Sequence, residues 1–178
     1  MLFDFDREAL PLRQASLSRE IFSKRFIANI AILTNLKRYR KTETNLTISR
    51  LQRLCFENDI TLYEFFHELE CPEEDYGSSS FFHEITLESI YTVIDKLTEE
   101  QDLSDYIICK INDWDFSNYR REKNLALEGK RKTFKIQKLY DILSIIDISF
   151  TAFFSLCEKE EQEKSRKHKA PRSEYALC

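Results

Sequence analysis

Glycine and proline are scarce in this sequence, which has two glycines and three prolines among 178 residues. It also lacks alternating runs of β-branched residues, so signals for strands are weak and a nearly all-helical protein is predicted. No apolar run approaches the length of about 18 residues that a membrane-spanning helix needs. The N-terminal segment is acidic, which argues against a signal peptide. We therefore expect a soluble cytoplasmic protein that does not bind membranes.

Residue types that build catalytic and metal sites are also sparse or scattered. The three histidines, His67, His83 and His168, do not have the spacing typical of metal ligands. The five cysteines include no C-x-x-C pair, and their odd number is typical of reduced thiols in a cytosol. No nucleophile with its base, carboxylate pair or glycine-rich phosphate loop can be assembled. The sequence thus predicts no enzyme, no metal and no cofactor.

What the sequence does contain is an internal repeat. Residues 47–70 return 88 positions later as residues 135–158. Each copy predicts two short helices joined at a tight corner, where Thr61 and Ser149 are suitable N-caps. Such a repeat indicates the overall architecture independently of where each helix is predicted to begin and end. The identical pairs are Ile48/Ile136, Leu51/Leu139, Asp59/Asp147, Ile60/Ile148, Phe65/Phe153, Phe66/Phe154 and Glu70/Glu158.

The repeat predicts two domains with the same order of helices. They cover residues 1–70 and 84–158, with a linker at 71–83 and a charged C-terminal tail at 159–178. Before the repeated pair, each domain should have three further helices. In the first domain these are residues 4–15, a helix capped by Ser18 and a helix capped by Asn29; in the second they are residues 85–100, a helix capped by Ser104 and a helix capped by Asp115.

Positive charge is concentrated in two windows, although the net charge is −4. Residues 24–41 hold six basic residues and no acidic residue, and residues 116–138 hold eight basic and two acidic residues. Each window therefore carries a net charge of +6. Their corresponding places in the two repeats indicate local anion-binding surfaces, with ordinary solvated helix faces as the alternative.

The order of these features resembles the lambda-repressor-like helix-turn-helix family, which includes Cro and the phage repressors and is often called the XRE family. The resemblance covers residues 17–66 and 103–154: a Leu-Ser entry to the second helix, a polar and basic third helix, a basic loop, and a closing Asp-Ile-Thr/Ser-x-x-x-Phe-Phe. It implies two tandem five-helix domains, in which the third helix lies in the major groove. The turn before that helix, often a glycine in the family, falls at Ile27 and Asp113.

The resemblance also implies which residues contact DNA. Arginine and asparagine suit bidentate contacts with guanine and adenine edges, whereas lysine neutralises the backbone. In the first domain the base-reading residues would be Asn29, Ile30, Thr34 and Asn35, and the phosphate contacts Lys37, Arg38, Arg40 and Lys41. In the second domain they would be Ser117, Asn118, Arg120 and Arg121, with Lys123, Lys130, Arg131 and Lys132 on phosphates.

Two functions are consistent with these features. The first is a sequence-specific DNA-binding transcriptional regulator of bacterial or phage type, whose two joined domains imitate a dimer and gain from effective concentration. The second is a protein-interaction module on the same fold, such as a phage inhibitor of a host defence enzyme. The apolar start of the first reading helix, Asn29-Ile30-Ala31, favours it. Double-stranded DNA is the expected partner, and a protein partner or a homodimer is left open.

Overall fold

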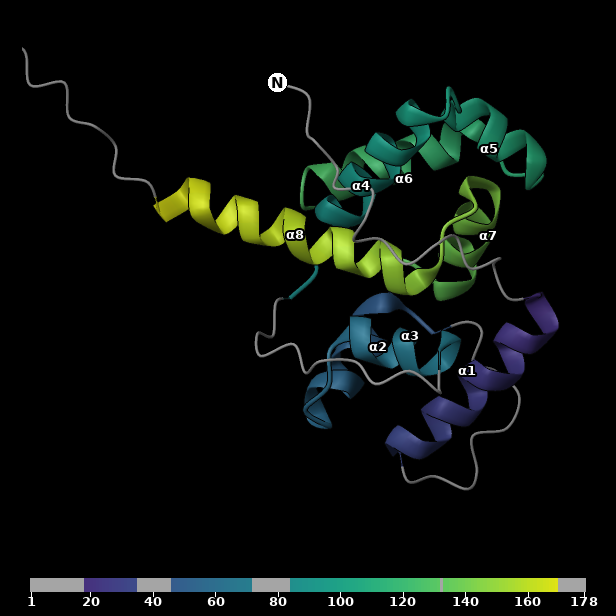
Figure 1. Ribbon diagram of the computed structural model, residues 1–178. Helices are drawn as coiled ribbons and strands as arrows, with labels where there is room; N and C mark the ends of the chain where they lie inside the picture. Colours follow the sequence, from purple (N-terminus) through teal and green to yellow (C-terminus); the bar gives the residue numbers. More distant parts are fainter. Residues whose placement is uncertain (1–17, 35–45, 72–83, 132, 170–178) are drawn as a thin grey trace, which may run out of the picture.

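The chain is helical throughout the residues that the structure describes. In this computed structural model these are residues 18–34, 46–71, 84–131 and 133–169. They form eight helices and no strand beyond one isolated β-bridge (Figure 1). The helices are α1 (Arg19–Thr34), α2 (Ile48–Glu57), α3 (Leu62–Glu70), α4 (Leu87–Glu100), α5 (Asp105–Ile111), α6 (Phe116–Leu127), α7 (Ile136–Ile146) and α8 (Phe150–Lys169). The predicted all-α class is confirmed for these residues.

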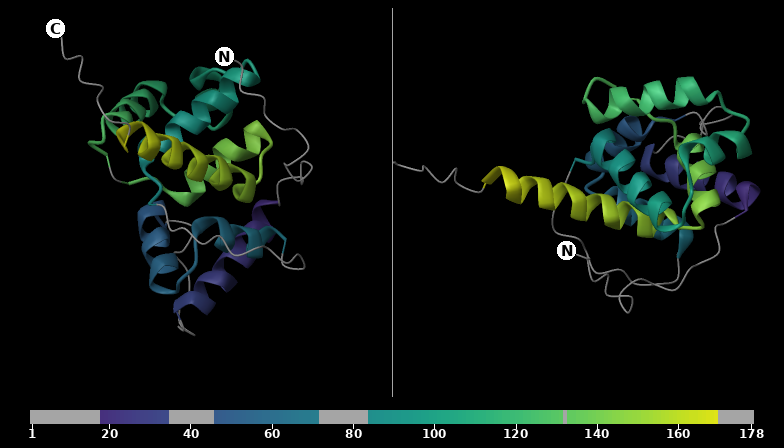
Figure 2. Two further views of the ribbon diagram at one scale, coloured as in Figure 1. Left: turned by 60° about the vertical axis from the view of Figure 1, so that its left-hand side comes forward. Right: turned by 90° about the horizontal axis from the view of Figure 1, so that it is seen from above.

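The second half of the molecule, α4–α8, contains five helices, of which α5, α6 and α8 begin at the caps that the sequence predicts. Ser104 caps α5, because its hydroxyl oxygen accepts the Ile107 N–H at 3.3 Å. Asp115 caps α6, because its carboxylate accepts the Asn118 N–H at 2.6 Å. Each cap satisfies a backbone donor that the helix itself leaves open. Helix α8 is the longest helix of this half, and Figure 2 shows its C-terminal part extending beyond the other helices.

Four aspartates end helices in the left-handed conformation that glycine usually adopts. Asp59, Asp102, Asp113 and Asp147 have φ values of 56°, 54°, 55° and 58°. After each of them, the next N–H bonds back to the carbonyl five residues earlier, at 2.8–3.2 Å. Aspartate tolerates this conformation better than most residues with a side chain. A chain with two glycines can therefore still turn sharply between helices.

The first half, α1–α3, departs from the prediction. Two helices with a turn near Ile27 were expected, but α1 is a single helix from Arg19 to Thr34. Phe22, Phe26 and Ile30 are spaced four residues apart and are all buried, so one unbroken helix directs them to the core. A β-branched residue such as Ile27 also disfavours the positive φ that the turn requires. The predicted helix-turn-helix in this half is therefore wrong, while the predicted helix at 4–15 lies outside the described residues.

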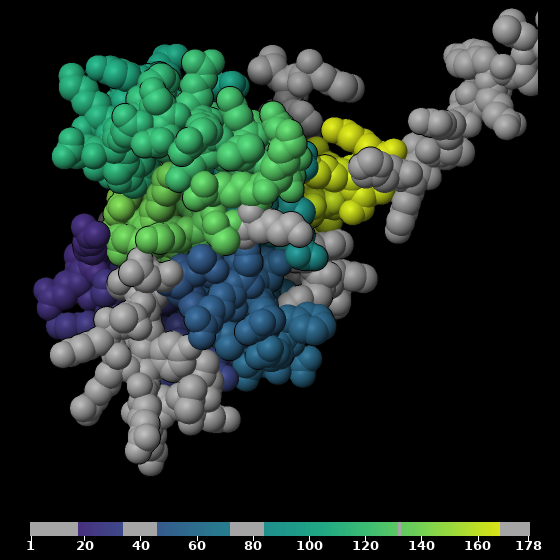
Figure 3. All heavy atoms as spheres, turned by 180° about the vertical axis from the view of Figure 1, so that it is seen from behind, coloured from purple at the N-terminus to yellow at the C-terminus, as the bar shows by residue number. Residues whose placement is uncertain are grey.

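Equivalent positions of the repeat meet where the two halves touch. Thr47 and Lys135 form an antiparallel β-bridge, and they are 88 positions apart. The residues beside them exchange two hydrogen bonds, from the Ile48 N–H to the Phe134 carbonyl at 2.8 Å and from the Ile136 N–H to the Leu46 carbonyl at 2.9 Å. If each residue is replaced by its equivalent in the other repeat, 48 by 136 and 134 by 46, the first bond becomes the second. The two bonds are thus related by an approximate local two-fold symmetry, of the kind found at isologous dimer contacts. Figure 3 shows the first half, in purple and blue, packed directly against the green part of the second half.

Aromatic side chains fill the rest of this interface. Phe66 of α3 and Phe154 of α8 are equivalent in the repeat, and their ring centroids are 5.0 Å apart. Phe150 stacks on Phe66 at 4.4 Å, and Phe22 of α1 stacks on Phe150 at 5.0 Å. All four rings are buried. Stacked aromatic pairs contribute beyond the area they bury, so the two halves share one hydrophobic core.

One pair of repeated glutamates breaks the symmetry. The Glu70 carboxylate accepts two backbone N–H groups at the start of α8, at 2.8 and 2.9 Å. Its counterpart, Glu158, makes no such bond to the start of α3 within the described residues. That helix is already closed by a capping box, in which Thr61 and Glu64 accept each other's backbone N–H. Glu158 is therefore left as a second carboxylate near Glu64.

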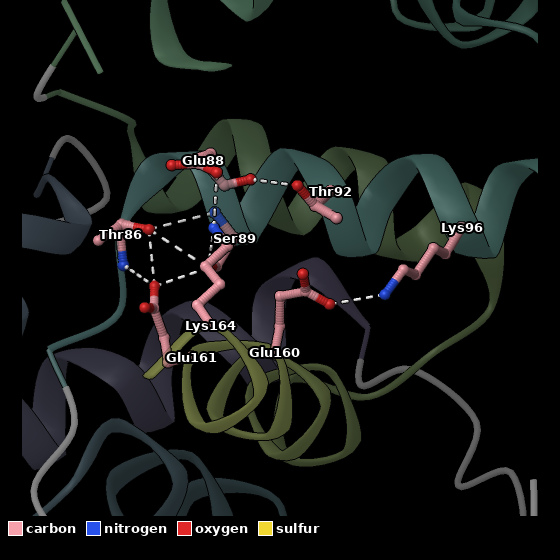
Figure 4. A network of polar contacts seen from close by, with 8 residues as sticks. All are labelled: Thr86, Glu88, Ser89, Thr92, Lys96, Glu160, Glu161 and Lys164. Atoms are coloured by element: carbon pink, nitrogen blue, oxygen red, sulfur yellow. Dashed lines mark hydrogen bonds and ion pairs between the residues drawn. The ribbon is translucent and has the colours of Figure 1, made fainter. Parts of the chain in front are cut away.

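The segment predicted as a charged tail forms part of α8. Helix α8 continues to Lys169 instead of giving way to a solvated tail after Glu158. The Glu161 carboxylate accepts the Thr86 N–H at 2.9 Å and the Ser89 hydroxyl at 2.6 Å, at the N-terminus of α4 (Figure 4). A carboxylate is favourable at a helix N-terminus. The acidic residues of the segment thus have a structural role that periodicity alone did not reveal.

Candidate nucleic-acid interface

Helices α5 and α6 follow each other in the second half and are joined by a short turn. The turn covers residues 112–115, and Asp113 provides its left-handed residue with φ 55°. The Trp114 N–H bonds to the Cys109 carbonyl at 2.8 Å, which closes the end of α5. Trp114 stacks on Tyr119 with centroids 6.1 Å apart, and Tyr119 is buried. These contacts fix the direction in which α6 leaves the turn.

The outer face of α6 carries the four side chains predicted to read bases. Ser117, Asn118, Arg120 and Arg121 are all exposed. The Arg121 guanidinium donates to Asn118 Oδ1 at 3.2 Å, and Arg120 makes no ion pair with any described residue. Asn124 lies one turn after Arg120 and is also exposed. Asn124 was not predicted as a contact, although its spacing of four residues from Arg120 places it on the same face.

Lys123 occupies a different position from the phosphate contact that was predicted. Its ammonium pairs with Asp105 of α5 at 2.7 Å and with Asp95 of α4, and its side chain is 13% exposed. Burial disfavours its charge, but the hydrogen bonds and charges of Asp105 and Asp95 outweigh burial and raise the pKa of Lys123. Lys123 therefore joins α6 to α4 and α5 inside the second half.

Arg131 and Lys138 also direct their charge inward. Arg131 pairs with Glu122 at 3.2 Å, and Lys138 pairs with the same carboxylate at 2.6 Å. Burial disfavours the ionised form of Glu122, but these two cations outweigh it and lower the pKa of Glu122. Lys138 also lies over the Trp114 and Tyr119 rings, 5.1 and 4.9 Å from their centroids. This network holds the inner face of α6 on α7.

The remaining basic residues of this window stay at the surface. Lys130 is exposed and pairs with Glu128 at 2.7 Å. Lys135, at the N-cap of α7, is exposed and was not predicted as a contact, although it lies in the basic window. Lys132 lies outside the described residues. Because acidic residues neutralise Lys123, Arg131 and Lys138, the window presents less positive charge to solvent than its composition suggests.

The first half does not present a second reading face among its described residues. Asn29 is half-buried and Ile30 is fully buried in α1, so the Ile30 side chain is not available to a thymine methyl group. The predicted role of Ile30 is corrected accordingly: it is a core residue. Thr34 is the last residue of α1. The other predicted contacts, Asn35, Lys37, Arg38, Arg40 and Lys41, lie outside the described residues and stay predictions.

Helix α5 exposes a small apolar cluster beside α6. Tyr106, Ile107 and Ile111 are 57%, 39% and 59% exposed, and the exposed Lys110 lies between them in sequence. Tyr106 packs edge-on against Phe116 of α6, with centroids 5.8 Å apart. Exposed apolar clusters of this kind are typical of surfaces that contact other proteins.

Another feature of the described residues is an open cavity. A cavity of about 760 Å³ opens between the halves, lined by α2, the N-terminus of α4 and the loop after α6. Its charged lining is mixed, with Arg53 and Arg131 beside Glu84 and Glu88. No group of three histidine, cysteine, aspartate or glutamate side chains in the described ranges could hold a metal ion. Burial raises the pKa of the Cys55 thiol to about 12, so it is a core residue.

Comparison with known proteins adds no further constraint. No protein-family model matches the chain. No curated protein and no solved structure is detectably similar to it. None of the described helices is by itself long and apolar enough to cross a membrane; α7 and α8 pass such a test only together, and they meet at a bend of 101°.

Proposed function

We propose that the protein binds double-stranded DNA through α5 and α6 and acts as a sequence-specific transcriptional regulator of bacterial or phage type. Helix α6 lies in the major groove, with its outer face towards the base edges. The contacts to bases come from Ser117, Asn118, Arg120 and Arg121, and those to phosphates from Lys130 and Lys135. The observation that carries the proposal is the polar outer face of α6, which follows a short turn and has no acidic side chain between Phe116 and Arg121.

The chemistry of that face suits base recognition. Arginine can donate two parallel hydrogen bonds to the N7 and O6 atoms of guanine, and asparagine can pair similarly with adenine. The bond from Arg121 to Asn118 holds the two side chains together before binding. Less ordering is then required when DNA binds, which favours affinity. The inward ion pairs of Glu122 and Lys123 support the helix and leave its outer face free of their charges.

The test is selection of a duplex from a random pool by the full chain at low salt, followed by titration of the selected duplex. Arg121→Ala should weaken binding by about 1–3 kcal/mol, because a bidentate base contact is lost. Arg53→Ala on α2 is the matched control: it removes the same charge from an arginine that is 70% exposed and lies in the first half. Failure to select any duplex would overturn the proposal, as would equal losses in the two variants.

The exposed cluster on α5 favours a second candidate, a protein-interaction module on the same fold. Tyr106, Ile107 and Ile111 present apolar area next to α6, and the inward pairing of Lys123 and Arg131 reduces the charge available to DNA. For this function, Tyr106→Ser with Ile111→Ser should abolish the stoichiometric complex with a purified protein partner, whereas Arg121→Ala should leave it intact. The opposite pattern, with duplex DNA bound and Arg121 required, would reject it.

A further inference from the structure

We propose that the protein reads a single half-site as a monomer, because its own first half occupies the surface through which a second reader would pair. The inference rests on the DNA-binding function proposed for α5 and α6. It concerns the class of site that is bound: an asymmetric duplex with one major-groove contact, in place of a palindrome with two.

The pairing surface of the second half is already in use. The backbone beside Lys135 is bonded to the backbone beside Thr47, through the Ile136 N–H and the Phe134 carbonyl. Phe154 of α8 is fully buried against Phe66 of α3. In an isologous dimer the same patch of each subunit makes the contact. Here the equivalent patch of the repeat supplies that contact within one chain, so a second copy finds this surface covered.

The described helices of the first half, α1–α3, do not include a second reading helix. By the two-fold relation between the repeats, the first half stands where the second subunit of a dimer would stand. Where a helix-turn-helix in the first half would need a turn, α1 continues without a break from Arg19 to Thr34. Phe22, Phe26 and Ile30 of that helix are buried in the core. A helix-turn-helix needs the break that residues 112–115 make between α5 and α6. Within residues 18–34, 46–71, 84–131 and 133–169, the chain therefore keeps the dimer-like scaffold with a single reading helix.

Two consequences follow for the DNA. Dimeric helix-turn-helix proteins contact two half-sites about 10 bp apart, whereas one reading helix contacts one major-groove segment. Fewer phosphates are neutralised, and the logarithm of affinity then falls less steeply with salt, because the slope is about −0.9 per phosphate contact. The first half acts as a built-in partner that prevents a second reader from being added through this surface.

The experiment is hydroxyl-radical footprinting of the full chain on its selected duplex, with the mass of the complex measured by analytical ultracentrifugation. We expect one protected segment and one chain per duplex. Trimming the duplex to that segment and its flanks should change Kd less than about twofold, since no second contact is lost. Two protected segments about 10 bp apart, or two chains per duplex, would overturn the single half-site while leaving DNA binding in place.

A variant pair distinguishes the two halves. Lys24→Ala on α1 removes a charge that is 75% exposed in the first half, and it should leave Kd and the footprint unchanged. Arg121→Ala should weaken binding by about 5- to 150-fold, the equivalent of about 1–3 kcal/mol. An equal loss from Lys24→Ala would show that the first half also reads the site and would overturn the inference. The absence of any bound duplex would instead overturn the proposed function, and this inference with it.

Discussion

Replacing Glu158 with glutamine should stabilise the protein at high pH and have little effect at low pH. Glu158 lies on α8 and Glu64 on α3, and the two helices pack together. Burial, and secondly the charge of Glu64, raise the pKa of Glu158 to about 7 from the ordinary glutamate value of 4.5. Its counterpart Glu70 receives two backbone N–H groups, whereas the capping box already occupies the corresponding helix end near Glu158.

The sign follows from which state holds the proton more tightly. The pKa of Glu158 is higher in the folded protein than in the unfolded chain. Its contribution to the free energy of unfolding is therefore fully favourable below about pH 4.5 and is lost as the pH rises towards 7. A difference of about 2.5 pKa units corresponds to about 3 kcal/mol. Solvent screening of this half-buried group lowers the figure to about 1–3 kcal/mol. Glu158→Gln removes the ionisation and should raise the free energy of unfolding by that amount at pH 8.

Urea unfolding of both proteins at pH 4, 5, 6, 7 and 8 measures the effect. The two free energies should nearly coincide at pH 4 and diverge progressively up to pH 8. Glu68→Gln is the control, because Glu68 is an exposed residue of the same packed helix pair, on α3. A difference between Glu158→Gln and the original chain that is constant with pH, or one that Glu68→Gln reproduces, would refute the reasoning.

Substitutions at two further positions test the second half. Asp113→Val should lower the free energy of unfolding by about 1–2 kcal/mol, since valine disfavours a φ of 55°, whereas Asp113→Gly should be neutral or stabilising; urea unfolding that ranks them equally would contradict this account of the turn. Tyr119→Phe should be neutral or raise the free energy of unfolding by about 1 kcal/mol, because the buried Tyr119 hydroxyl has no hydrogen-bond partner among the described residues. A clear loss of stability would mean that the hydroxyl is bonded.

The features that the sequence predicts well depend on near neighbours. The caps at Ser104 and Asp115 lie within three residues of the N–H groups that they accept, so a short motif contains both partners. The corner aspartates Asp59 and Asp147 are equally local, and their recurrence in the repeat marks two turns of the same geometry. Local chemistry of this kind predicted the all-helical class and the order of helices in the second half.

The features that the sequence predicts poorly depend on distant residues or on competing signals. Asn29 is an acceptable N-cap, but the inward face of Phe22, Phe26 and Ile30 outweighs it and keeps α1 continuous; their spacing of four residues was the available signal. Lys123 was predicted to contact a DNA phosphate, because nothing near it in sequence identifies its partner Asp95, which lies 28 residues away. A window of basic residues shows how much positive charge a segment contains. Which of its side chains point to solvent is determined by the fold.

The exchanged backbone bonds at the interface have a consequence for folding. The N–H groups of Ile48 and Ile136 find their acceptors only in the other half of the chain. If the halves separated, each would leave backbone donors and acceptors unpaired and would expose the Phe66 and Phe154 rings to water. Stable sub-domains are therefore not expected from this duplicated chain: loss of either half removes the support of the other, and heat or urea should melt the whole molecule in one cooperative step.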